Sequence, residues 1–101
     1  MTDYRITLAA QADIEEIVER IAADDRALAL RFENTLYAAF ERLAEHPQLG
    51  HRRTDLTNRP VLFWPVMRQA FAVIYRASAP IVILRIVRWR RLSDSVLADE
   101  L

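Results

Sequence analysis

The residues best suited to chemistry form a short run near the C-terminal end, where residues 88–91 read Arg-Trp-Arg-Arg. Arg85 stands just before this run and Arg68 lies in the preceding turn. Guanidinium groups make bidentate contacts with phosphates and carboxylates, and an indole can stack on a base. The cluster therefore predicts a binding surface for a phosphate-bearing ligand or an acidic protein partner. The competing interpretation is structural: some of these arginines pair with acidic helix residues, and Trp89 belongs partly to the core.

A second basic patch is formed by His51, Arg52 and Arg53, with Arg59 further on in the same polar stretch. A basic loop is most often simply solvated. We therefore interpret this patch as solvated surface, unless it folds beside residues 88–91.

Several kinds of site lack the residues that they need. The chain has no cysteine, which excludes disulfides and thiolate metal sites, and His46 and His51 lack the further ligands of a metal shell. The single glycine, Gly50, excludes phosphate-binding loops built on several glycines. Neighbouring carboxylates such as Glu16, which can pair with Arg20 one turn later, are expected on a solvated helix face. We predict no metal, no cofactor and no catalytic residue.

The formal net charge of zero conceals a polarity along the chain. Residues 1–50 carry five arginines and ten acids, whereas residues 51–101 carry nine arginines and four acids. The two halves therefore have opposite charges, and the basic half contains the candidate binding surface. All fourteen basic residues are arginines, which fits either a GC-rich genome or a need for planar bidentate donors.

The N-terminal residues predict a strand followed by a helix. Residues 3–8 alternate between polar and apolar side chains, a period-two pattern that places Tyr4, Ile6 and Leu8 on one face of a half-buried strand. From residue 9 to about residue 23 the apolar spacing changes to three and four, which predicts an amphipathic helix.

A second helix follows almost at once, because Asp24 and Asp25 can cap it. Its apolar stripe runs from Leu28 to Leu43 in steps of three and four, and Pro47 ends it. With so short a junction the two helices must form an antiparallel hairpin, which joins their apolar faces or lays both on a sheet.

The second half of the chain predicts strands. After a turn-rich loop at residues 46–59 come apolar runs at residues 61–66, 70–76 and 81–87, separated by short turns typical of an antiparallel meander. Pro65 cannot donate to a ladder, so the first run should lie nearer an edge, whereas the last looks buried on both faces.

These elements, with a short last helix that Ser93 can cap, give the order βααβββ(α) of an α+β fold. Residues 1–101 have the length of a single domain with one core. No apolar stretch is long enough to span a membrane, and the first residues lack the pattern of a signal peptide. We expect a cytoplasmic protein with no membrane partner.

Four segments, in this order, resemble the ParE branch of the RelE/ParE toxin superfamily. They are the opening YRITLAAQADIEEI, the hairpin end LAEHPQLGHRR and the strands FAVIYR and ILRIVRWRR, which together span about residues 4–92. The resemblance implies a type II toxin–antitoxin system and a helical hairpin packed on a curved, mainly antiparallel sheet. It also implies a cognate antitoxin that wraps the toxin. The predicted antitoxin contacts are Ile14, Val18, Phe32, Phe40, Phe63 and Trp64.

The resemblance further implies one of two targets, DNA gyrase or ribosome-bound mRNA. Ribonuclease members typically carry an arginine where Ala72 stands in this chain, and a histidine or tyrosine near the C-terminus, which the segment after Arg91 lacks. Cleavage needs a general base and a general acid as well as cationic stabilisation, and only the cations are plainly present. We therefore predict a toxin that performs no chemistry of its own and poisons gyrase by binding.

The predicted gyrase-binding residues are Arg68, Arg88, Trp89, Arg90 and Arg91. A ribosome-dependent endoribonuclease that uses the same arginines, and an inactive relative that only binds its antitoxin, remain the alternatives. Direct nucleic-acid binding stays open, because a basic patch alone is not evidence of sequence readout.

Overall fold

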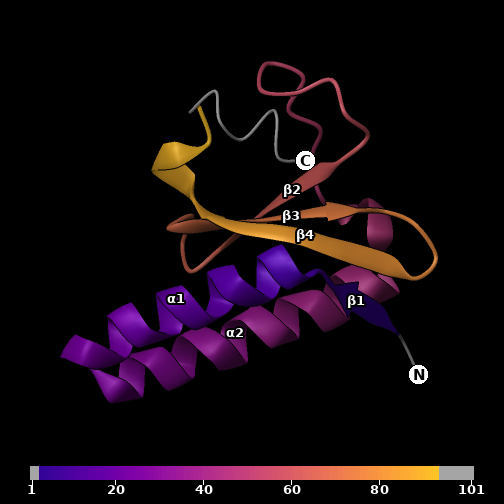
Figure 1. The fold of residues 1–101 in the computed structure, drawn as a ribbon. Coiled ribbons are helices and arrows are strands. Elements are labelled where there is room, and N and C mark those ends of the chain that lie inside the picture. Colours follow the sequence, from indigo (N-terminus) through magenta and orange to yellow (C-terminus); the bar gives the residue numbers. More distant parts are fainter. Residues whose placement is uncertain (1–2, 94–101) are drawn as a thin grey trace.

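Two helices pack on one face of a four-stranded sheet (Figure 1). The computed structural model describes residues 3–93. Its regular elements are β1 (Tyr4–Ile6), α1 (Leu8–Asp24), α2 (Arg26–Glu45), the 3₁₀ helix η1 (Pro47–Leu49), β2 (Leu62–Val66), β3 (Phe71–Arg76), β4 (Ile81–Arg88) and the 3₁₀ helix η2 (Trp89–Arg91). The predicted α+β class and the order βααβββ are confirmed. The last helix predicted from Ser93 onward falls outside the described residues, apart from Ser93 itself.

Both long helices begin at a capping side chain. The Thr7 hydroxyl accepts a hydrogen bond from the backbone N–H of Ala10, and the Asp25 carboxylate accepts one from the N–H of Leu28. Thr7 therefore ends the strand earlier than the alternation predicts. Leu8 opens α1 with 90% of its surface exposed, so its predicted place on the buried face of a strand was wrong.

The strand order is β1-β4-β3-β2, with β2, β3 and β4 antiparallel and β1 parallel to β4. The mainly antiparallel sheet is therefore confirmed. As Pro65 predicts, β2 lies at an edge. The neighbouring loop covers part of that edge, because His51 and Phe63 exchange two backbone hydrogen bonds of 2.9 and 2.8 Å.

A β-bulge interrupts the pairing of β3 with β4. Ile74 lies opposite Arg85 while Tyr75 lies opposite Ile83, which leaves Leu84 as an extra residue on β4. The residues of β4 that face the helices are therefore Ile81, Ile83 and Ile86, a spacing of two and then three. Bulges re-aim side chains and increase local twist. Here the bulge changes which side chains of β4 meet α1.

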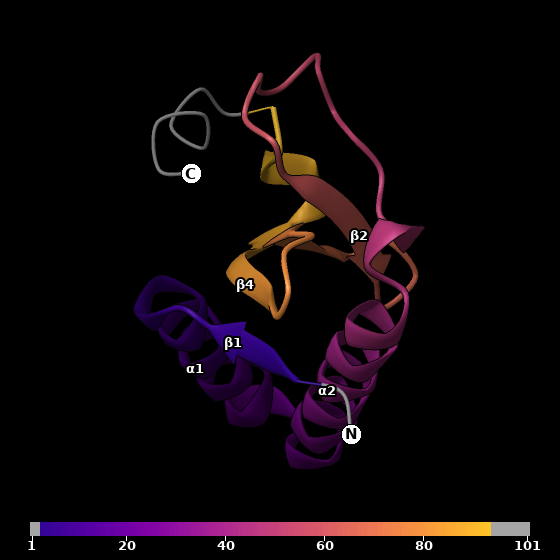
Figure 2. The ribbon, with the colours of Figure 1, turned by 90° about the vertical axis from the view of Figure 1, so that its right-hand side faces the viewer.

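Apolar side chains fill both faces of the sheet. The larger cluster lies between the sheet and the hairpin, and the smaller one lies on the opposite face with Val61, Phe63, Ala72, Ile74 and Leu92 at its centre. Figures 1 and 2 show the loop after η1 and the helix η2 on the side of the sheet away from α1 and α2. The outward face of β4 is only half-buried, so its predicted burial on both faces was too strong.

From residue 32 onward, the apolar stripe of α2 is buried, as the sequence predicts. Leu28, at the start of the predicted stripe, is 36% exposed beside the junction of the two helices. No helix within residues 3–93 is long and apolar enough to cross a lipid bilayer.

Candidate functional site

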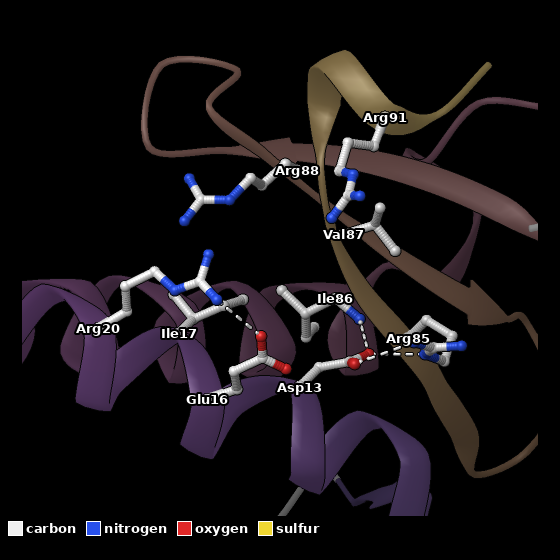
Figure 3. Close-up of a pocket in the computed structure, with 9 residues that line it drawn as sticks. All are labelled: Asp13, Glu16, Ile17, Arg20, Arg85, Ile86, Val87, Arg88 and Arg91. Carbon is white, nitrogen blue, oxygen red and sulfur yellow. Dashed lines mark hydrogen bonds and ion pairs between the residues drawn. The ribbon is translucent and has the colours of Figure 1, made fainter. Parts of the chain in front are cut away.

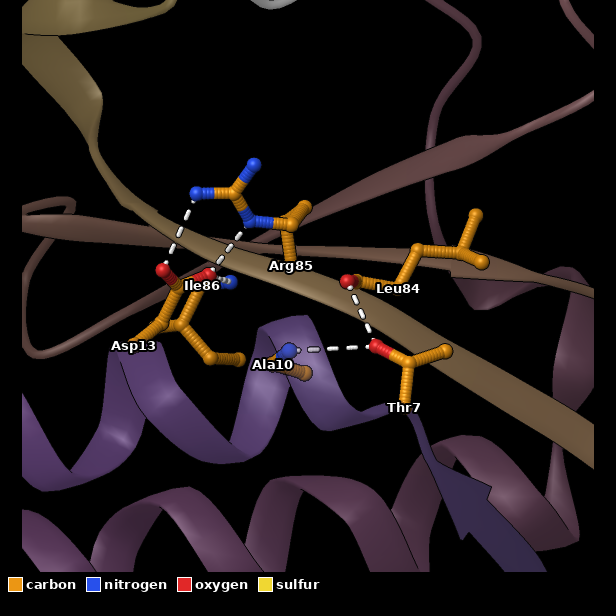
Figure 4. Close-up of polar contacts among 6 residues, drawn as sticks. All are labelled: Thr7, Ala10, Asp13, Leu84, Arg85 and Ile86. Atoms are coloured by element: carbon orange, nitrogen blue, oxygen red, sulfur yellow. Dashed lines mark hydrogen bonds and ion pairs between the residues drawn. The ribbon is translucent and has the colours of Figure 1, made fainter. Parts of the chain in front are cut away.

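The contact between α1 and β4, here called the seam, uses some of the polar side chains of the predicted site for folding. Strand β1 pairs with β4 only as far as Ile83, and beyond that point α1 lies beside β4 instead of a strand. Two side chains replace the missing partner (Figure 4). The Thr7 hydroxyl donates to the carbonyl of Leu84 at 2.9 Å, and the N–H of Ile86 donates to the Asp13 carboxylate at 3.0 Å. Backbone groups that lost their strand thus keep hydrogen-bond partners.

Arg85 completes this seam. Its Nε and one terminal nitrogen donate to the two oxygens of Asp13 at 2.7 and 3.0 Å, with side chains that are 22% and 14% exposed. This is the bidentate arrangement that guanidinium and carboxylate groups favour. Arg85 therefore behaves as the structural interpretation of the arginine cluster expects, because it pairs with an acidic residue of a helix. Asp13 could have been noticed in the sequence, because an acid at this position interrupts the apolar stripe of Ala10, Ile14 and Ile17.

A polar groove of about 160 Å³ opens between α1 and β4 beside this seam (Figure 3). Glu16 and Arg20 form an exposed ion pair at 3.1 Å on its α1 side. The guanidinium groups of Arg20 and Arg88 point toward each other across the groove, and Arg91 reaches down from η2. In this lining Arg85 pairs with Asp13 and Arg20 with Glu16, whereas Arg88 has no carboxylate partner among the described residues. The exposed pair of Glu16 with Arg20 confirms the pairing predicted from the sequence.

A second hollow, of about 320 Å³, lies on the other side of Arg88. It is lined by Gln69, Ala70, Arg88, Trp89 and Arg90, and the backbone N–H of Trp89 donates to the carbonyl of Ala70 at 3.0 Å. This hydrogen bond joins η2 to the turn between β2 and β3. The turn that contains Arg68 therefore lies beside η2.

That turn has an unusual backbone. Three consecutive residues, Met67, Arg68 and Gln69, have positive φ angles of 52°, 55° and 66°. The left-handed region costs a residue with a side chain about 1–2 kcal/mol. Strain of this kind persists where the surroundings enforce it, and it is common at functional sites. Here it presents the exposed Arg68 beside the second hollow.

The other members of the predicted cluster differ in burial. Arg88 lies over the Phe71 ring, 5.3 Å from its centroid, and is half-buried, whereas Arg90 and Arg91 are exposed. Trp89 packs partly against the smaller apolar cluster. Among the described residues, no carboxylate pairs with Arg68, Arg88 or Arg90.

The predicted antitoxin contacts divide into two groups. Four side chains are 0–2% exposed and belong to the apolar clusters: Ile14, Phe32, Phe40 and Phe63. Val18 and Trp64 are only half-buried. A fully buried side chain presents almost no surface to a partner, so packing within this chain accounts for Phe32, Phe40 and Phe63. Ile14 is nearly as buried, but it also lines a groove on the helical hairpin. Val18 helps to line this groove of about 220 Å³, with Glu15, Glu19 and Glu33 around it.

The second basic patch does not join residues 88–91. Arg53 makes two hydrogen bonds to Asp55, and His51 is tied by its backbone to β2. Arg52 instead lines a hollow with Arg76, at the end of β3 away from Phe71. No cluster of three potential metal ligands occurs in the part of the chain that the structure describes.

A comparison with family models decides the classification. Residues 4–92 match the model described as "ParE toxin of type II toxin-antitoxin system, parDE". The chain belongs to the ParE toxin family. This confirms the resemblance noted in the sequence, and it implies an antitoxin as a partner.

Among solved structures, the ParE-family chain is similar to one titled "Chromosomal ParDE TA system from P. aeruginosa", with a TM-score of 0.72. The two share 23% sequence identity over 87% of this chain and 96% of the other. At this identity the likeness establishes the fold, including the helical hairpin on the mixed sheet. No individually curated protein matches the chain.

Proposed function

We propose that this ParE toxin inhibits DNA gyrase by binding it through its basic end, defined as Arg68, Arg88, Trp89, Arg90 and Arg91. It acts in the cytoplasm, where gyrase works on the chromosome, and its antitoxin neutralises it by covering its surface. The toxin contributes contacts and performs no reaction.

The observation that carries this proposal is a set of arginines without a carboxylate partner. Arg88 and Arg90 line one hollow, and the exposed Arg68 is the chain neighbour of Gln69, which also lines it. None of the three arginines has a carboxylate partner among the described residues. Charged groups left without intramolecular partners beside a half-buried aromatic are suited to an acidic protein surface, and tryptophan and arginine dominate interface energetics. The strained turn that holds Arg68 next to them supports a role for this arrangement beyond folding.

Two features favour binding over RNA cleavage. The five residues that line the hollow, Gln69, Ala70, Arg88, Trp89 and Arg90, include no carboxylate, histidine or tyrosine that could move a proton. The tyrosine of β3 is engaged elsewhere: the fully buried Tyr75 donates to the carbonyl of Pro47 at 2.6 Å and accepts from the N–H of Gly50 at 2.8 Å. Neither the lining of this hollow nor Tyr75 therefore offers the general base that cleavage at a 2′-hydroxyl requires.

For the antitoxin, the half-buried Val18 and Trp64 are the predicted contacts that this proposal keeps. They lie on different elements, with Val18 on α1 and Trp64 on the edge strand β2. A partner that touches both has to wrap around the hairpin and reach the sheet.

The test is a supercoiling assay in which the folded toxin is titrated into gyrase, ATP and relaxed plasmid. The proposal predicts blocked supercoiling or accumulation of linear DNA, and reversal when the antitoxin is added. No effect at large molar excess would contradict it. Toe-printing of translated mRNA in the same preparation separates the alternative, because only a ribonuclease would produce new 5′ ends in the ribosomal A site.

A further inference from the structure

The basic loop that the gyrase-binding surface does not use forms part of a separate hollow of about 470 Å³. It is lined by Gln48, Arg52, Pro60, Leu62, Arg76, Ala77 and Ser78. The lining has two cations and no acid, and leucine, proline and alanine supply apolar surface. Arg52 and Arg76 are exposed, and no ion pair holds either one within residues 3–93.

The backbone that carries Arg52 is held firmly in place. Its neighbour His51 is joined to Phe63 of β2 by two backbone hydrogen bonds, and Gly50 donates to the buried hydroxyl of Tyr75. A Cβ atom at position 50 would lie 2.6 Å from that hydroxyl oxygen and 2.9 Å from the Cβ of Leu62. The chain's single glycine therefore stands at a close approach of the loop to β2 and β3, near Gln48 and Arg52 of the hollow.

The hollow and the basic end lie at opposite ends of β3. Arg76 is the last residue of β3, whereas Phe71, its first residue, lies beneath Arg88. A strand of this length spans roughly 17 Å. A ligand bound in the hollow would therefore make contacts separate from those of the basic end.

We propose that this hollow is an anchor site for an acidic segment of the antitoxin, which places an aspartate or glutamate between Arg52 and Arg76 and an adjacent apolar side chain against Leu62. The inference rests on the antitoxin partner of the proposed function, and names a site for it. Charge complementarity selects this occupant, because unmatched guanidinium groups attract carboxylates. A nucleic acid fits less well, since no aromatic side chain in the lining offers a stacking surface.

The first test compares antitoxin affinity between two double variants of equal charge. Arg52→Ala/Arg76→Ala removes the proposed contacts, and Arg31→Ala/Arg59→Ala removes two exposed arginines that lie outside the hollow. We expect the first to weaken binding of the purified antitoxin by about fivefold or more, and to reduce the salt dependence of binding. The control should bind as the wild type does. Gyrase inhibition should be the same for both.

The second test places a reporter at the rim of the hollow. Since the chain has no cysteine, Gln48→Cys introduces a unique thiol there, and Asn34→Cys provides an exposed control on α2. We expect the antitoxin to slow alkylation of the first thiol and not of the second.

The outcomes separate this inference from the proposed function. A wild-type toxin that binds no antitoxin would overturn the anchor site together with the antitoxin partner of the proposed function, whereas a loss of gyrase inhibition in the supercoiling assay would overturn the gyrase proposal alone. A toxin that binds antitoxin, while the Arg52/Arg76 variant binds equally tightly and the Gln48→Cys thiol reacts at an unchanged rate, would overturn the anchor site alone.

Discussion

Arg85 and Arg88 are three residues apart on β4, yet their surroundings differ completely. Arg85 makes a bidentate contact with Asp13 that also anchors α1 to β4. Arg88 lies over an aromatic ring and has no carboxylate partner among the described residues. The same side chain thus holds the fold together at one point and remains available for a partner at the next.

The difference arises from where β1 stops. Next to Arg85 the backbone of β4 has lost its strand neighbour, so a carboxylate that satisfies Ile86 and Arg85 together is strongly favoured. After Arg88 the strand ends and the chain turns into η2, and no carboxylate of the described residues forms an ion pair with Arg88. The number of arginines in a segment is therefore a poor guide to function, and the contacts that each arginine makes are a better one.

The largest effect should come from the basic end itself. Replacing Arg68, Arg88 and Arg90 by alanine removes three cations that no carboxylate of the described residues pairs with, and should weaken gyrase inhibition roughly a hundredfold. The melting temperature should change little. Inhibition curves at matched folded concentration measure the effect, and full potency in a folded triple variant would refute the role of this surface.

Substitutions in the seam between α1 and β4 should instead lower stability. Asp13→Ala leaves Arg85 and the N–H of Ile86 without their acceptor, which should lower the free energy of unfolding by about 2–4 kcal/mol. Glu16→Ala is the matched control one turn away, and breaking its exposed pair with Arg20 should cost at most about 0.5 kcal/mol. Urea unfolding compares the two, and equal losses would show that the buried pair has no special role.

A smaller effect is expected at alkaline pH, at the opposite end of β3. Burial raises the pKa of the Tyr75 phenol above its ordinary value near 10, so the folded state retains this proton at a pH where the unfolded chain releases it. The contribution of Tyr75 to stability should therefore be constant below about pH 10 and fall as the pH rises through the folded-state pKa.

Tyr75→Phe should flatten this alkaline dependence while lowering stability at neutral pH, because it removes the hydrogen bonds to Pro47 and Gly50. Some dependence should remain, since burial also raises the pKa of Tyr4. Unfolding measured from pH 8 to pH 11 checks this, and an identical slope in the variant would contradict it.

Periodicity in the sequence predicted most of the fold. The two helices, the three antiparallel strands and the edge position of β2 follow from apolar spacing, from Asp25 as a cap and from Pro65. The prediction failed at Leu8 because the Thr7 cap ended the strand before its alternating pattern did. A local capping hydrogen bond outweighed a pattern only a few residues long.

The site was harder to predict because it depends on contacts between distant residues. The pairing of Asp13 with Arg85 joins residues 72 positions apart, and nothing in the chain marks Arg85 as different from Arg88. The apolar stripes likewise could not reveal whether this chain or a partner covers them, which is why Phe32 and Phe40 were predicted as contacts and belong to the core. The role of Arg68 and residues 88–91 stays a prediction, although the structure does place the turn that contains Arg68 beside the end of β4, where Gln69 and Ala70 share a hollow with Arg88, Trp89 and Arg90.

The most direct test of the account compares the single variants Arg85→Ala and Arg88→Ala in two assays, thermal unfolding and gyrase supercoiling. We expect Arg85→Ala to lower the melting temperature by several degrees and to retain inhibition per folded molecule. We expect Arg88→Ala to keep most of the melting temperature and to lose inhibition. Parallel changes in both variants, or a wild-type toxin without effect on gyrase, would contradict the division of roles between these two arginines.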